Sequence, residues 1–120
     1  MKKRILIVVA AFLVIAACSK SDGGGGNGGG TGGSSCSGVN AAFAANVNPI
    51  IQSTCATDVT CHGAGSANGP GPLLTYTQIF TARAQIKAAV AAGTMPKTGS
   101  ITAAQKSTII CWVDAGGPNN

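Results

Sequence analysis

A glycine-rich tract near the N-terminus limits the size of the domain that this chain can form. Nine of the 18 glycines lie between Gly23 and Gly33, in a stretch that has no apolar side chain to bury. From Cys36 to Asn120, beyond the tract and two serines, 85 of the 120 residues remain. A domain that short has a thin core and usually depends on disulfides, a metal or a cofactor. We therefore expect one small domain and exclude a large enzyme with a substrate domain of its own.

The charged residues argue against a nucleic-acid partner and against hydrolytic catalysis. The formal net charge of +5 includes three basic residues at the extreme N-terminus. Within Cys36–Asn120 only four basic residues stand against two acidic ones, and four dispersed positive charges form no phosphate-binding stripe. With two carboxylates and a single histidine, no catalytic dyad or triad can be assembled. We expect a protein that is not an enzyme.

The first 17 residues have the pattern of a secretion signal. Met1–Arg4 is a short segment with three basic residues, and an unbroken apolar run follows over Ile5–Ala17. That run is too short to span a bilayer of about 30 Å. It ends in small residues directly before Cys18, which resembles the lipobox of bacterial lipoproteins. We expect residues 1–17 to be a lipoprotein signal peptide and Cys18 to be lipidated; the alternatives are an ordinary secretory signal with a chance cysteine or an uncleaved anchor.

Residues 18–35 then form a lipidated cysteine and a flexible glycine-rich linker, ahead of a folded domain at 36–120. As a flexible coil, the linker would reach about 20–25 Å. Acyl chains on Cys18 would tether the domain to a membrane without spanning it. We expect a lipid-anchored protein of the bacterial cell envelope, with its domain in the periplasm or on the outer surface.

The domain is predicted to be all-α, because no segment shows the sustained alternation of a strand. Proline after asparagine, and Ser/Thr-x-x-Gln capping boxes before apolar periodic runs, mark helix starts. Glycines mark helix ends. The expected helices are a short one after the N-cap Asn48 with Pro49 at its first position, one from Thr75 and Gln78 to Ala92 with Gly93 as its stop, and one from Thr102 and Gln105 through Val113.

The most informative cluster joins the only histidine to two cysteines. Five residues separate Cys55 from Cys61, and His62 follows the second cysteine directly. Cys-x-x-Cys-His attaches c-type haem, with both sulfurs added to the vinyl groups and the histidine placed under the iron. Residues six positions apart on a helix differ by about 240° in direction, so the wider gap must loop out around Thr57 and Asp58. Spacing alone makes this a weak haem signal.

Met95 strengthens that signal. The segment Gly93-Thr94-Met95-Pro96 lies between two predicted helices. Its methionine, Met95, comes 33 residues after His62. A thioether is a soft, neutral ligand, and Met/His ligation is typical of electron-transfer cytochromes c. A methionine in an apolar context is more often core filler. Together with the Cys-Cys-His cluster, we favour Met95 as a ligand.

The domain resembles the class I cytochromes c, of the small lipoprotein-anchored kind known from Bacteroidetes. The stretches that carry the resemblance span essentially all of Val47–Asn120. They are Val47-Asn48-Pro49-Ile50-Ile51, Cys55 and Cys61-His62-Gly63, Leu73-Leu74-Thr75-Tyr76, Met95-Pro96, and Trp112-Val113-Asp114-Ala115-Gly116-Gly117-Pro118-Asn119-Asn120.

The resemblance implies a small helical domain wrapped around one haem c and an electron-transfer role with protein redox partners. It assigns Cys55 and Cys61 as thioether links, and His62 and Met95 as axial iron ligands. If the first and last helices pack together as in that fold, with Trp112 between them, Cys36 and Cys111 are neighbours and a disulfide candidate. The apolar wrapper would come from Ile50, Ile51, Leu73, Leu74, Tyr76, Ile79, Phe80, Ile86, Val90, Ile101 and Ile109.

Other readings of the same residues stay open. Cys55 and Cys61 would form a structural disulfide in a haem-free, disulfide-stapled surface lipoprotein that acts as a binding or structural module. A Cys/His zinc site would need a fourth ligand. We expect Lys97 and Lys106 either to border an exposed haem edge or, more simply, to be solvated surface lysines.

Overall fold

The computed structural model describes residues 35–120, which form four helical elements. They are a π-helix η1 (Phe43–Val47) and three α-helices, α1 (Asn48–Thr54), α2 (Tyr76–Ala92) and α3 (Ala103–Asp114). No strand occurs in this part of the chain, so the all-α prediction is confirmed. None of its helices is long and apolar enough to cross a membrane. The expected signal peptide, the lipidation site Cys18 and nearly all of the linker lie outside the described residues.

Helices α2 and α3 begin where the capping boxes predicted. The side chains of Thr75 and Thr102 accept the backbone N–H of Gln78 and Gln105, and each glutamine side chain accepts the backbone N–H of its threonine in return. Gly93 ends α2 in the left-handed conformation, with φ of 70°. These signals are local, so the sequence alone predicts them well.

The start of the first helix was predicted wrongly. Asn48 is not an N-cap: it has helical φ and ψ angles, and its N–H donates to the carbonyl of Phe43 as the last bond of η1. The chain is therefore already helical when it reaches Pro49. Proline has no N–H and crowds the carbonyl four residues earlier, and the wider π turn just before it accommodates that conflict.

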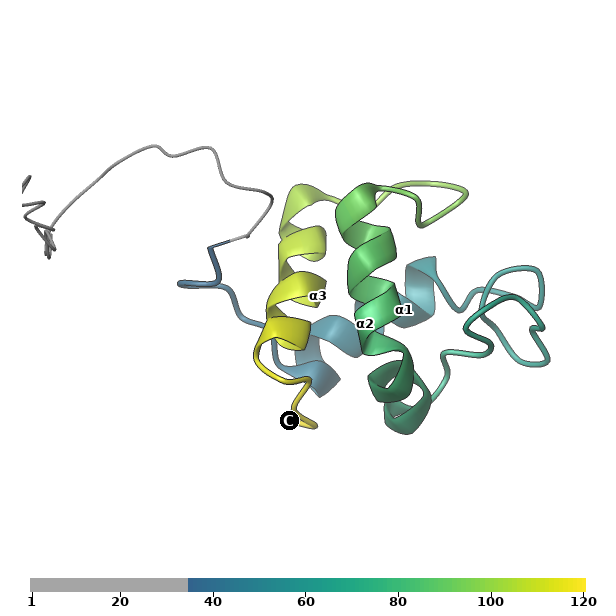
Figure 1. Ribbon diagram of the computed structural model, residues 1–120, viewed down its shortest axis with the longest axis horizontal. Coiled ribbons are helices and arrows are strands. Elements are labelled where there is room, and N and C mark those ends of the chain that lie inside the picture. The colour runs from purple at the N-terminus through teal and green to yellow at the C-terminus, as the bar shows by residue number, and fades with distance from the viewer. Residues whose placement is uncertain (1–34) are drawn as a thin grey trace, which may run out of the picture.

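Helices α2 and α3 lie side by side and run in opposite directions, while η1 and α1 pass behind them in the view of Figure 1. The loop between α1 and α2 extends to one side of this bundle (Figure 1). Trp112 is fully buried, and its ring centroid lies 5.5 Å from that of Phe43, so α3 packs against η1, the element just before the first helix that the sequence predicted. The core comprises Phe43, Val47, Ile51, Leu73, Ile79, Ala82, Ile86, Val90, Ile109, Ile110 and Trp112.

One residue of the expected apolar wrapper is exposed. Leu74 keeps 41% of its surface in solvent, whereas its neighbour Leu73 keeps only 2%. Leu74 stands directly before Thr75, the N-cap of α2, and its N–H donates to the side chain of Gln78 in the first turn of that helix. The local capping geometry turns this side chain away from the core.

The C-terminal segment holds the N-terminal helices in place. The Asn120 side chain accepts the N–H of Phe43 at 2.9 Å, and its carbonyl accepts the N–H of Ala44 at 2.7 Å. Asn120 therefore caps η1 from 77 residues away. The indole of Trp112 donates to the Pro118 carbonyl, which fastens the same segment to α3.

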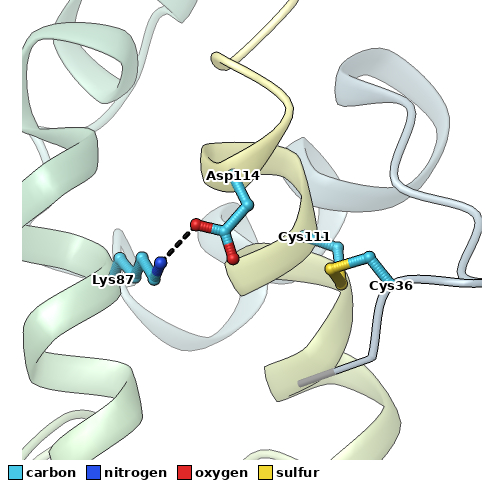
Figure 2. Close-up of a disulfide and its surroundings, with 4 residues drawn as sticks. All are labelled: Cys36, Lys87, Cys111 and Asp114. Atoms are coloured by element: carbon cyan, nitrogen blue, oxygen red, sulfur yellow. Dashed lines mark hydrogen bonds and ion pairs between the residues drawn. A yellow bond between two sulfur atoms is a disulfide. The ribbon is translucent and has the colours of Figure 1, made fainter. Parts of the chain in front are cut away.

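A disulfide joins Cys36 to Cys111, with a Cα–Cα distance of 5.4 Å (Figure 2). It links the start of the described chain to the buried third turn of α3. Nearby, an ion pair between Lys87 and Asp114 connects α2 to the end of α3 (Figure 2). The pair that the resemblance implied is thus the pair that the fold brings together.

Candidate functional site

All four residues that the sequence singled out for haem binding line one pocket. The pocket has a volume of about 390 Å³. Pockets that hold small molecules and cofactors commonly measure about 300–1,000 Å³. Its polar and sulfur-bearing walls include Cys55, Cys61, His62 and Met95, and its apolar walls include Leu73, Ile86 and Val90.

Cys55 and Cys61 are both free thiols, so the alternative disulfide between them is absent from the structure. Cys55 ends α1, where its N–H donates to the carbonyl of Ile51 at 2.9 Å. Burial raises the pKa of the Cys55 thiol, and the nearby Cys61 charge raises it further, while the Thr54 hydroxyl at 3.5 Å acts in the opposite sense. Cys55 is therefore a protonated, neutral thiol at neutral pH.

His62 is the most firmly held member of the site. It is buried, with 8% of its surface exposed. Its N–H donates to the Cys55 carbonyl at 2.9 Å, and its own carbonyl accepts the N–H of Leu73 at 2.8 Å. Nδ1 lies 3.1 Å from the Gly71 carbonyl, which can only accept, so Nδ1 carries the proton. Nε2 is then the unprotonated nitrogen, with a lone pair available for a ligand.

Such a bond from the second ring nitrogen to a backbone carbonyl is typical of metal-ligating histidines, because it fixes the tautomer and the ring orientation. Sequence reasoning missed the contribution of Gly71. A carbonyl carries no residue-type signal, and the bond depends on how the loop before α2 returns to His62. The two flanking prolines, Pro70 and Pro72, were the only local sign that this loop is conformationally restricted.

Met95 comes to the pocket from the segment between α2 and α3. The preceding residue, Thr94, fastens this segment to the end of α2 through its N–H and its hydroxyl. Both donate to the carbonyl of Ala89, at 3.0 and 3.2 Å. The Met95–Pro96 bond is cis. Met95 lines the pocket from a segment that the Thr94 bonds anchor directly upstream of it.

The donor set suits a haem better than a bare metal ion. Two thiols, an imidazole with a free Nε2, a thioether and an apolar wall are the groups that covalent attachment and His/Met ligation require. Within residues 35–120, no three His, Cys, Asp or Glu side chains are grouped as a metal-ion site would need. A structural zinc site at this cluster therefore lacks its ligands.

The two lysines near the predicted site have different roles. Lys97 is exposed and lines the pocket. Lys106 is not among the lining residues; its Nζ donates to the Ala91 carbonyl at 2.8 Å and so caps the end of α2. A cation at a helix C-terminus is favourable, because it meets unpaired carbonyl groups. Lys97 alone remains as a candidate charge at the pocket rim.

Comparison with protein-family models, with curated proteins and with solved structures found no match to this chain.

Proposed function

We propose that this chain is a membrane-anchored electron-transfer protein whose helical domain wraps one covalently attached c-type haem. The observation that carries the proposal is that two free thiols, a buried imidazole and a thioether line a single apolar-walled pocket. When bound, the haem iron would supply one-electron redox chemistry. Because no substrate is converted in such a role, we expect no enzymatic turnover.

Different residues of the chain would attach the haem, bind its iron and exclude water from it. Cys55 and Cys61 would each add a thiol across one vinyl group. His62 would hold the iron through Nε2, with its ring fixed by the Gly71 carbonyl. Met95 would hold it through its thioether, and such a ligand favours the reduced state and hence a relatively high potential. Leu73, Ile86 and Val90 would exclude water from the pocket.

The remaining parts of the proposal concern location and partners. Lipidation at Cys18 would tether the domain in the bacterial cell envelope, in the periplasm or on the outer surface. Redox partner proteins would dock transiently at the pocket mouth, where Lys97 offers a positive charge. The Cys36–Cys111 disulfide is the pairing expected in an oxidising compartment.

The alternative is a haem-free surface lipoprotein stapled by disulfides. The Cys36–Cys111 bridge fits both functions equally. The alternative leaves Cys55 and Cys61 as two unoccupied thiols in an oxidising compartment, together with an imidazole and a thioether that have no shared purpose. The proposed cytochrome gives each of these groups a role.

The ligand role of Met95 can be tested spectroscopically. Met95→Leu preserves an apolar side chain of similar size but removes the sulfur. We expect this variant to lose the weak near-infrared charge-transfer band of a sulfur–iron bond and to have a lower reduction potential. Thr98→Ala, an exposed lining residue without a ligand atom, is the matched control and should leave both unchanged. An unchanged spectrum in Met95→Leu would show that the thioether is not a ligand.

A further inference from the structure

The five residues between Cys55 and Cys61 form a closed lobe rather than a slack connection. The carbonyl of Cys55 accepts the N–H of His62 at 2.9 Å, so the chain leaves the end of α1 and returns to it. Because His62 follows Cys61 directly, this bond brings the backbone at Cys61 close to that at Cys55. Residues 57–60 turn outward into solvent without helical structure, as the angular argument from the sequence required, while Ala56 packs against the core.

The side chain of Asp58 organises this lobe. Its Oδ1 accepts the N–H of Thr60 at 2.8 Å, the hydroxyl of Thr60 at 2.6 Å and the N–H of Cys61 at 3.1 Å. These bonds lower the pKa of the Asp58 carboxyl, with the Thr60 hydroxyl as the largest cause. One exposed carboxylate therefore fixes the backbone at the point where the chain turns back toward Cys61.

The other side of the lobe depends on Gly63. Its N–H donates to the Asp58 carbonyl at 2.7 Å. A Cβ at position 63 would lie 2.6 Å from both the carbonyl carbon and the carbonyl oxygen of Asp58. No side chain fits at that distance from backbone atoms, so only glycine permits this approach. The close packing of Gly63 against the backbone of Asp58 therefore holds the lobe closed independently of the Asp58 side chain.

The loop that follows braces the second cysteine from outside. The hydroxyl of Ser66 donates to the Cys61 carbonyl at 2.5 Å, and the amide of Asn68 donates to the Thr60 carbonyl at 2.6 Å. Ser66 is buried, while the tip of the lobe is exposed. The lobe therefore has a fixed base at Cys61 and an exposed tip at Asp58.

We propose that Asp58 and Gly63 are positioning residues that fold the five-residue gap back on itself, so that Cys55 and Cys61 present their thiols to the same pocket at the spacing one tetrapyrrole requires. This inference rests on the proposed function. In each attachment the S–H bond breaks, sulfur bonds to one vinyl carbon and the proton goes to the other, with no net oxidation. The lobe thus supplies the spacing that a two-residue gap provides in the standard motif.

The spacing can be measured without haem. In the haem-free full chain carrying Cys18→Ser, Cys55 and Cys61 are the free thiols once Cys36 and Cys111 are joined. Dibromobimane, which fluoresces when it bridges two close thiols, reports their proximity. We expect rapid bridging in this parent and roughly tenfold or slower bridging in Asp58→Ala, because small misplacements of reacting groups slow a reaction steeply. Asp58→Asn keeps the Oδ1 acceptor and should restore most of the rate.

Two further variants separate positioning from general damage. Gly63→Ala should slow bridging as Asp58→Ala does, although it leaves the carboxylate in place. Thr57→Ala is the matched control in the same lobe, since its hydroxyl makes only a 3.4 Å contact with Oδ2. Far-UV circular dichroism should show the same helix content in all of them, because the lobe lies outside the core. If one variant fails to fold, the other decides the question.

The haem-loaded chain gives a second readout. When the protein is matured with haem, Asp58→Ala should shift the pyridine haemochrome band toward that of a single thioether link, and Asp58→Asn should not. Unchanged bridging in both Asp58→Ala and Gly63→Ala would overturn the positioning role, whatever the haem content. If the parent binds no haem but both variants still slow bridging, the proposed function fails while the spacing role of the lobe stands.

Discussion

Removing the Cys36–Cys111 disulfide should destabilise the domain more than any surface substitution. The bridge closes a loop with a sequence separation of 75 residues. On the chain-entropy model, a loop of that length stabilises the folded state by about 4.5 kcal/mol at 25 °C. For a domain of this size, each kcal/mol shifts the melting temperature by roughly 4–8 °C. We therefore expect Cys36→Ser combined with Cys111→Ala to melt roughly 18–36 °C lower than the parent.

The assay is thermal and urea unfolding followed by far-UV circular dichroism, with parent and variant in the same haem state. Cys36→Ser alone should lose nearly as much stability as the double variant, because either change opens the loop. The reduced parent should match them both. A loss below roughly 1.5 kcal/mol in the double variant would refute the reasoning, since it would mean that the unfolded chain gains little freedom when the bridge is removed.

Three smaller predictions concern single side chains. Thr75→Ala should lower the free energy of unfolding in urea by about 1 kcal/mol, because it removes the oxygen that caps α2. Thr77→Ala, the control, should lower it much less. Equal losses in the two variants would contradict the capping role. Lys87→Met should change the free energy of unfolding by less than about 1 kcal/mol, since both side chains of its ion pair with Asp114 are more than one-third exposed. A larger loss that depends on salt concentration would show that the ion pair is better shielded from solvent than the structure indicates. The pKa of Asp58 is held below its ordinary value of 3.8, so its contribution is fully present above that pH and is lost as the pH falls through the lower, folded-state pKa. The stability advantage of the parent over Asp58→Asn should therefore shrink as the pH falls below 3.8, which urea unfolding across that range would measure; a difference that does not change with pH would contradict this role.

The parts of the structure that the sequence predicted are those determined by neighbouring residues. The two capping boxes and the stop at Gly93 are local, and each lies where it was expected. The outward turn of the gap after Cys55 also followed from helix geometry alone. The pairing of Cys36 with Cys111 came from the family resemblance, because four cysteines do not reveal their connectivity.

The parts that were missed depend on contacts between distant residues. The π-helical start at Phe43 is capped by Asn120, which no local pattern announces. The carbonyl of Gly71 reaches His62 only because the intervening loop turns back. Leu74 is expected in the apolar wrapper around the haem, but the capping geometry of α2 leaves it exposed.

The most direct test of the proposed function is the intact mass of the mature protein together with its pyridine haemochrome spectrum, after expression in a host that matures c-type haem. We predict a mass raised by one haem and the absorption band of two thioether links, which would establish attachment at Cys55 and Cys61. A mass without haem and a spectrum without a Soret band would contradict the proposal and leave the disulfide-stapled lipoprotein in its place.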